Sequence, residues 1–199
     1  MNIFAFSSPA LTGRLDVASI DGRERMNEPY VFHVVAQLPT GEEEAWQTML
    51  GQRATLSIRY ADSSARVRHG IVTSFVVVGR APQGGALVEL QLEPRFSTMS
   101  LRQDSRIFQN LTARQICDLV FAEHRVRCEW RTQRTYLSRE YCVQYQESDE
   151  RFVRRLLAEE GILFWFEHPG VGDAAADGEE ELVLADDAHQ HGTILGDPV

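Results

Sequence analysis

The first hundred residues alternate between apolar and polar positions with a period of two, which is typical of β-strands that are buried on one face. Leu15, Val17 and Ser19 alternate with Asp16, Ala18 and Ile20. After a turn-rich stretch from 21 to 29, the run YVFHVVAQL places Tyr30, Phe32, Val34 and Ala36 on one face. We expect the face that carries these four side chains to point into a core.

A short helix is predicted between the second and third strands. Thr40 and Glu43 have the spacing of a capping box, with acidic residues in the first turn. Trp46, Met49 and Leu50 follow at helical spacing, and Gly51 suits the helix end.

Three further strands are predicted, with the sequences ATLSIRY, VRHGIVTSFVVVG and ALVELQLEP. RAPQGG, which contains Gly84 and Gly85, joins the last two as a hairpin turn. Short strands with turn signals and one short helix favour a small β-barrel or sandwich over residues 1–100.

The pattern changes near Ser97. Thr112 and Gln115 form a second capping box, and Ile116, Leu119 and Val120 are predicted as the buried stripe of a helix. Val126, Cys128 and Trp130 then alternate with arginines and Glu129, which predicts a half-exposed strand.

The segment Tyr141–His168, YCVQYQESDERFVRRLLAEEGILFWFEH, predicts a strand, a helix and a second strand that dock as one unit. Ser148 is the expected N-cap, Asp149 and Glu150 favour the positive end of the helix dipole, and Gly161 suits a left-handed C-terminal residue. We expect the aromatic side chains of this segment to be buried. The predicted inward face of the helix consists of Phe152, Val153, Leu156 and Leu157.

These elements indicate a β-rich α+β protein, in which a small β-barrel is followed by an α+β domain with a strand–helix–strand unit. The expected domains are 1–100 and 101–199, each incomplete. A last strand, LVLA, follows the Gly- and acid-rich stretch PGVGDAAADGEEE.

Charge excludes one class of partner. The formal net charge is −9, every one of the 20 basic residues is arginine, and no basic residue follows Arg155. An acidic chain is a poor ligand for a phosphate backbone, so the Arg-rich stretch 125–139 does not predict nucleic-acid binding. The chain has no apolar run long enough to span a bilayer, and its first residues, MNIFAFSSPALTGR, lack the pattern of a secretory signal. Cys117, Cys128 and Cys142 have no metal-type spacing and are expected to be free thiols.

Few residues suggest chemistry. His189 and His191, next to Asp186 and Asp187, could begin a metal site of a metal-dependent hydrolase, but the chain offers no convincing further ligand. Glu159 and Glu160 are neighbours on a helix, where adjacent side chains diverge. We therefore predict no enzyme activity and no catalytic, cofactor-binding or metal residues.

The ordered segments resemble the N-terminal part of the VgrG spike proteins of bacterial type VI secretion systems, which are similar to the hubs of contractile phage tails. The resemblance is carried, in order, by LDVASIDGRERMNEPYVFHV, LGQRATLSIRY, HGIVTSF, VELQLEPRFSTMSLRQDSRIFQNLTARQI, REYCVQYQESDERFVRRLLAEEGILFWFEH and LVLADD. Together they run from Leu15 to Asp187. The pair formed by RIFQ and YCVQYQESDERFVRRLLAEEGI is highly specific, whereas LVLADD alone is weak.

The resemblance implies a structural hub that forms a homotrimer, docks on the hexameric Hcp tube and supports effector delivery. It also implies baseplate proteins, a tip protein and effectors as partners, mostly through regions beyond these 199 residues. The expected location is the bacterial cytoplasm before firing and a target cell, or the medium, afterwards. A hub of a phage or prophage contractile tail is the alternative that these motifs also fit.

Overall fold

The computed structural model describes residues 3–11, 13–41, 46–60, 65–82, 84–169 and 178–187. Its described residues divide into two compact units, one drawn from 1–25, 29–97 and 166–181, the other from 26–28, 98–165 and 182–199. The chain therefore enters the second unit three times. The prediction that the chain consists of two domains, 1–100 and 101–199, stays a prediction.

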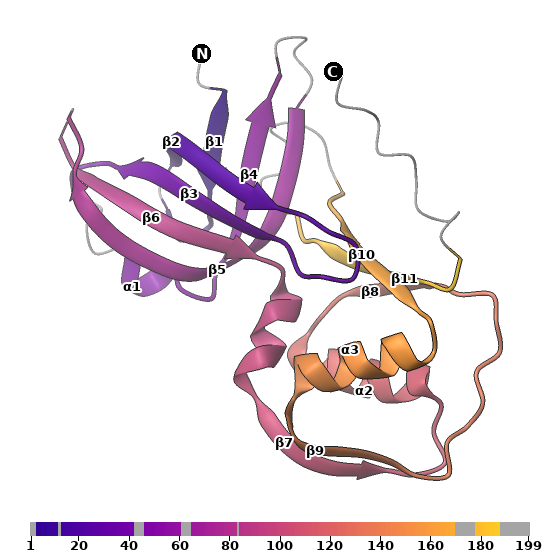
Figure 1. Ribbon diagram of the computed structural model, residues 1–199. Helices are drawn as coiled ribbons and strands as arrows, with labels where there is room; N and C mark the ends of the chain where they lie inside the picture. Colours follow the sequence, from indigo (N-terminus) through magenta and orange to yellow (C-terminus); the bar gives the residue numbers. More distant parts are fainter. Residues whose placement is uncertain are drawn as a thin grey trace. The chain divides into compact units, whose positions relative to one another are not determined.

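The first unit contains a closed antiparallel barrel of six strands in the order β1-β2-β3-β6-β5-β4 (Figure 1). The strands are β1 (Phe4–Ser7), β2 (Arg14–Arg23), β3 (Val31–Leu38), β4 (Arg53–Arg59), β5 (Ala65–Arg80) and β6 (Ala86–Glu93), and the short helix α1 (Trp46–Met49) precedes β4. The predicted inward face of β3 is confirmed, because Tyr30, Phe32, Val34 and Ala36 are all buried. The predicted capping box of Thr40 and Glu43 before α1 stays a prediction, because Glu43 lies outside the described residues.

The predicted face of β2 is correct only at its start. Leu15 is buried and Val17 packs against the core, but Ser19 is exposed and Ile20 packs against the core instead. The register against β3 shifts between Val17 and Ser19. A β-bulge adds one residue to one strand and thereby moves the following side chains to the opposite face, which strict alternation cannot anticipate.

The second unit contains helices, a two-stranded ribbon and parts of a three-stranded sheet. The elements are the 3₁₀ helix η1 (Arg95–Leu101), which begins in the first unit, β7 (Gln103–Phe108), α2 (Ala113–His124), β8 (Cys128–Arg131), β9 (Cys142–Ser148), α3 (Asp149–Glu159), β10 (Leu163–Glu167) and β11 (Glu181–Ala185). Strands β7 and β9 pair antiparallel, and the other sheet has the order β10-β11-β8 with β11 parallel to β8. The three cysteines are free thiols, as expected.

The predicted capping box of α2 is confirmed. The Gln115 N–H donates to Thr112 Oγ1 at 3.1 Å, and the Thr112 N–H donates to Gln115 Oε1 at 2.9 Å. The predicted stripe is wrong at Leu119, which is 50% exposed. The buried residues follow the spacing i, i+3, i+4, i+7, i+8 of one helix face, and they are Ala113, Ile116, Cys117, Val120 and Phe121.

Helix α3 matches its prediction closely. The Arg151 N–H donates to Ser148 Oγ at 3.2 Å, and Phe152, Val153, Leu156 and Leu157 are buried. Gly161 has φ +65° and its N–H donates to the carbonyl of Ala158.

The prediction for β9 is wrong about which face is buried. Tyr141 and Tyr145 are 54% and 70% exposed, whereas Cys142 and Gln144 point inward. The predicted alternation itself is correct. However, the pattern shows only that Tyr, Val and Tyr lie on one face and Cys and Gln on the other, and it does not show which of the two faces a helix covers. Here the inward Gln144 is needed by a buried carboxylate described below.

Replacing Gly161 by alanine is expected to lower the free energy of unfolding by about 1 kcal/mol, because an L-residue at positive φ is strained. The nearest atom to the added Cβ would be Arg134 Nη2 at 3.6 Å, so no steric clash adds to this cost. Urea unfolding would measure the change. Gly79→Ala is the control, since Gly79 lies in a strand with no atom within 4 Å of the added Cβ and is expected to change stability by less than about 0.5 kcal/mol. Equal effects of the two substitutions would contradict the assignment of a left-handed cap.

Candidate functional site

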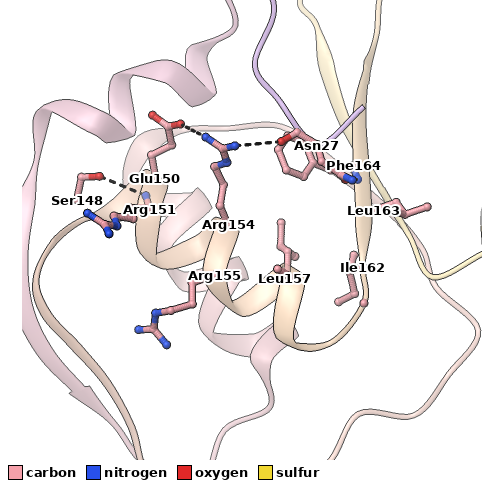
Figure 2. Close-up of a pocket in the computed structure, with 12 residues that line it drawn as sticks. Asn27, Ser148, Glu150, Arg151, Arg154, Arg155, Leu157, Ile162, Leu163 and Phe164 are labelled. Carbon is pink, nitrogen blue, oxygen red and sulfur yellow. Dashed lines mark hydrogen bonds and ion pairs between the residues drawn. The ribbon is translucent and has the colours of Figure 1, made fainter. Parts of the chain in front are cut away.

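A groove lies beside α3 in the second unit, with a volume of about 700 Å³ (Figure 2). We call it the α3 groove. Its walls are one side of α3, the turn after it and the start of β10. The lining residues are Asn27, Ser148, Glu150, Arg151, Arg154, Arg155, Leu157, Ala158, Gly161, Ile162, Leu163 and Phe164.

Two of the three arginines in the α3 groove are already held by neighbours. Arg154 binds Glu150 at 3.2 Å and the carbonyl oxygen of Asn27 at 3.3 Å (Figure 2). Arg155 binds Glu147 at 2.6 Å and Glu159 at 3.0 Å. The hydrogen bond to Glu147, more than any other contact, raises the pKa of Arg155. The hydroxyl of Ser148 accepts the Arg151 N–H as the helix cap, and the carboxylate of Glu150 is paired with Arg154.

Asn27 closes one side of the α3 groove by pairing with β10. It has φ +64°, its N–H donates to the Phe164 carbonyl at 2.8 Å, and its Oδ1 accepts the Phe164 N–H at 2.9 Å. Asn27 thus satisfies both backbone groups of Phe164, the carbonyl through its own backbone N–H and the N–H through its side chain. On this side the α3 groove is therefore bounded by hydrogen bonds between Asn27 and the backbone of β10.

Asp149 is the centre of a buried polar cluster that sequence reasoning missed. Its carboxylate is fully buried and accepts hydrogen bonds from Arg102 at 2.5 Å, Arg106 at 2.9 Å, Gln144 at 2.7 Å and His124 at 2.6 Å. Burial alone would raise the pKa of Asp149, but the hydrogen bonds from Gln144, His124 and Arg102 and the charge of Arg106 outweigh it and lower the pKa. We call these five residues the Asp149 cluster.

The role of Asp149 was predicted as favourable charge at the α3 N-terminus, which its position permits. The four partners of the carboxylate come from β7, from α2, from β9 and from Arg102, the residue before β7. Arg102 is 47 positions from Asp149 in the sequence. The available signal was Gln144, a polar residue on the same face of β9 as Cys142. All four partners donate hydrogen bonds to the carboxylate and so favour its charged form.

A second buried polar group lies in the first unit. His69 is fully buried, and its Nε2–H donates to the Pro169 carbonyl at 2.9 Å. Its Nδ1 therefore accepts from the Thr55 hydroxyl at 3.0 Å. The His69 N–H donates to His168 Nδ1 at 3.0 Å.

This histidine pair is held neutral. Burial lowers the pKa of both His69 and His168. The Tyr30 hydroxyl donates to the His69 carbonyl, so the pair is tied to the barrel wall. A Cβ at Gly178 would overlap the His69 ring, hence the chain passes directly over it. The ring nitrogens of His69 are all used inside the protein, which makes it a structural rather than a catalytic histidine.

The candidate metal residues are only partly described. Asp186 accepts the N–H groups of Gln133 and Arg134 at 3.0 and 2.8 Å and the Tyr136 hydroxyl at 2.9 Å, so its carboxylate anchors a loop. His189 and His191 lie outside the described residues. Among residues 3–187 as described, no three potential ligands come together as a metal site. Metal analysis of the purified protein remains the test of the hydrolase hypothesis.

The other charged candidates are paired with each other. Arg139 binds Glu159 and Glu160, each at 2.6 Å. Arg134 donates to Asp186 and to the Glu160 carbonyl, and Arg131 binds Glu129. Within the described part of the chain, no helix is long and apolar enough to cross a membrane.

Asp186→Asn is expected to lower stability at pH 7 and to flatten the acid side of the stability profile. Burial would raise the pKa of Asp186, but the Arg134 and Gln133 N–H groups, the Tyr136 hydroxyl and the Arg134 side chain lower it to about 2. The carboxylate therefore stabilises the fold at any pH above the ordinary pKa of an aspartate, and this stabilisation is lost as the pH falls toward 2. Thermal unfolding between pH 7 and pH 2.5 would measure it, with the exposed Glu140→Gln as control. Parallel profiles of wild type and Asp186→Asn would contradict the assignment.

Comparison with known proteins places both units in one context. A profile described as phage tail baseplate hub (GPD) matches residues 23–199. The type VI secretion system spike protein VgrG4b of Pseudomonas aeruginosa is 32% identical over 208 residues, which cover 98% of this chain and 25% of that protein. The chain thus spans about a quarter of the length of the curated relatives that it matches over nearly its whole length.

Solved structures agree with this. An Escherichia coli component of the type VI secretion system, described as structurally similar to T4 bacteriophage tail proteins, matches with a TM-score of 0.76 and 27% identity over 92% of this chain and 49% of that one. A prophage tail protein of Shewanella oneidensis has a TM-score of 0.58 at 14% identity, covering 91% of this chain and 53% of that one, which shows a shared fold alone.

Proposed function

This chain belongs to the phage tail baseplate hub family, and on that premise we propose that it serves in the base of a type VI secretion spike. The observation that carries the proposal is the 32% identity to a VgrG spike protein over 98% of the chain. Because that match covers both units, the chain is a VgrG-like spike or phage hub component as a whole. The role is structural and non-enzymatic.

The geometry supports a structural role. The buried carboxylate of Asp149 and the buried ring of His69 are both satisfied by internal hydrogen bonds, and two of the three arginines of the α3 groove are held by carboxylates. Polar groups used in this way make a fold specific and rigid and leave no group poised for reaction.

We further propose that the natural protein that carries this sequence forms a homotrimer and docks on the Hcp tube. A trimer can match a hexameric ring if each subunit offers two similar barrels, of which the β1–β6 barrel would be one. Size-exclusion chromatography with light scattering is expected to give three subunits per particle. A strictly monomeric protein at micromolar concentration would contradict the trimer.

Docking needs its own experiment. The purified protein is expected to co-sediment with assembled Hcp rings and not with an unrelated ring of similar size. Equal sedimentation with both rings would contradict specific docking. Baseplate proteins, a tip protein and effectors would then be further partners, with cytoplasmic assembly followed by delivery out of the cell.

A hub of a phage or prophage contractile tail is the second candidate, because the matching profile is that of a phage baseplate hub and a prophage tail protein shares the fold. Neighbouring genes distinguish the two. Genes for a secretion sheath and tube favour the spike, whereas head and tail-fibre genes favour the phage tail.

A further inference from the structure

The β7–β9 ribbon has one face that no described element covers. Helices α2 and α3 lie over one face of the ribbon, and the other is open (Figure 1). On the open face Ile107 lies opposite Val143 in the register, and Val143 is flanked along the chain by Tyr145 in β9 and by Tyr141, the residue before β9. These four side chains, which we call the outer face, are between 36% and 70% exposed.

The hydrogen-bond register shows where the backbone groups of Ile107 point. Opposed residues in an antiparallel pair alternate between bonded and non-bonded positions. The Asn110 N–H donates to the Glu140 carbonyl at 3.4 Å, which makes their position a bonded one. The next bond, from the Arg139 N–H to the Leu111 carbonyl at 2.9 Å, lies beyond the left-handed Asn110, where the regular alternation ends. Ile107 lies three positions before Asn110 and Val143 three positions after Glu140, so they are a non-bonded pair.

A second observation supports this register. The Val143 carbonyl accepts the guanidinium of Arg155 at 3.0 Å, so it points away from β7. By the same alternation, the N–H and C=O of Ile107 point away from β9. Among the described strands, β7 pairs with β9 alone, so these two groups face an open edge.

The open edge is short and has definite ends. At one end the Ser105 N–H is taken by Asp104 Oδ1 at 2.7 Å, next to a register shift. At the other end Asn110 adopts φ +55°, which stops an extended strand. Residues 105–109 therefore offer one short stretch of unpaired strand edge beside an apolar face.

We propose that β7 accepts an extended segment of a partner protein as an added strand. Strand addition combines main-chain hydrogen bonds at an open edge with contacts for alternate side chains. The outer face is uncharged, so the segment would carry apolar, uncharged residues at every second position and would extend the ribbon to three strands.

The size of the outer face favours a segment over a second copy of this chain. From the usual surface of such side chains, the four expose on the order of 400 Å² together. A stable complex of two folded proteins typically buries about 800 Å² on each partner. A single strand anchored by backbone hydrogen bonds fits the smaller area.

The test uses the 199-residue chain and a synthetic peptide of alternating valine and threonine, seven residues long, with a neutral solubilising tail. Titration followed by amide NMR is expected to shift the resonances of residues 105–109 and of Tyr145. A control peptide that is N-methylated at every residue has no N–H donor on either edge and is expected to bind about tenfold more weakly or not at all.

Two substitutions at one position separate the edge from the fold. Ile107→Pro removes only the outward N–H, because the ladder to β9 uses Arg106 and Phe108, and is expected to weaken peptide binding about tenfold. Ile107→Val keeps the donor and is expected to bind within about twofold of wild type. If Ile107→Pro does not fold, Tyr145→Ser leaves β7 intact and is expected to weaken binding several-fold.

Three results would overturn the proposal. The first is an absence of shifts in residues 105–109 at millimolar peptide. The second is equal binding of the N-methylated peptide. The third is concentration-dependent dimerisation of the chain through residues 105–109 without peptide, which would make a second copy the occupant of this edge.

Discussion

Replacing Asp149 by alanine is expected to lower the free energy of unfolding by about 3 kcal/mol. The substitution removes a fully buried carboxylate that accepts hydrogen bonds from Arg102, Arg106, His124 and Gln144. Breaking a buried ion pair by removing one partner typically costs about 3–5 kcal/mol, since the remaining charge is left uncompensated. The lower end applies here because the Arg102 and Arg106 side chains are 40% and 20% exposed and can regain water.

Urea unfolding would measure this loss, with Glu140→Ala as the control for removing an exposed acid from the same unit. The control is expected to change stability by less than about 0.5 kcal/mol. Asp149→Asn keeps the shape and removes the charge, so it is expected to lie between alanine and wild type. An Asp149→Ala protein as stable as the control would show that the Asp149 cluster contributes nothing to folding.

The same carboxylate gives a signed pH dependence. Because the pKa of Asp149 is lowered in the folded state, its contribution is present above the unfolded pKa of about 3.9 and is lost as the pH falls through the folded value. The part of the stability difference between wild type and Asp149→Asn that comes from this carboxylate should therefore shrink as the pH falls below about 4. A difference that grew on acidification would contradict this sign.

Replacing Gly85 by alanine is expected to cost about 3 kcal/mol or more, the second large effect. Gly85 ends the turn between β5 and β6 with φ +81°, and an added Cβ would overlap the backbone carbonyl oxygen of Leu38. Positive φ costs an L-residue about 1–2 kcal/mol, and a backbone clash cannot be relieved by rotating a side chain. Because Leu38 ends β3, any shift would disturb the pairing of β3 with β6.

Gly84 provides a matched control in the same turn. It has φ +95°, but the nearest atom to its added Cβ would be Thr40 Oγ1 at 3.4 Å, an ordinary contact. Gly84→Ala should therefore cost only the conformational part, about 1 kcal/mol. Thermal unfolding of both variants isolates the steric part, and equal losses would contradict a close approach at Gly85.

Local features of this protein could be predicted from the sequence because their physical causes lie within a few residues. The Thr112–Gln115 capping box, the Ser148 cap and the positive φ of Gly161 each depend on a side chain or backbone group at most four positions away. The period-two pattern likewise predicted β2 to β6 of the barrel but not β1, and the ordered motifs were sufficient to indicate the hub family.

The alternation of apolar and polar residues left the buried face of two strands undecided, and only the packing of the fold resolves it. Alternation assigns the residues of β9 to two faces but does not say which face is covered, and Tyr141 and Tyr145 proved to be exposed. In β2, the bulge after Val17 turns Ser19 away from the core and places Ile20 against it. The register of a strand is set by its partner, so one inserted residue reverses every later assignment.

The sequence by itself thus determined most of the elements, the caps of α2 and α3, and the family, but it did not predict β1 or β7. The tertiary structure alone decided the polar centres, because Asp149 meets Arg102 47 positions away and His69 meets His168 99 positions away. A buried charge or imidazole must find hydrogen-bond partners wherever the fold brings them, and no local preference encodes a contact across that distance.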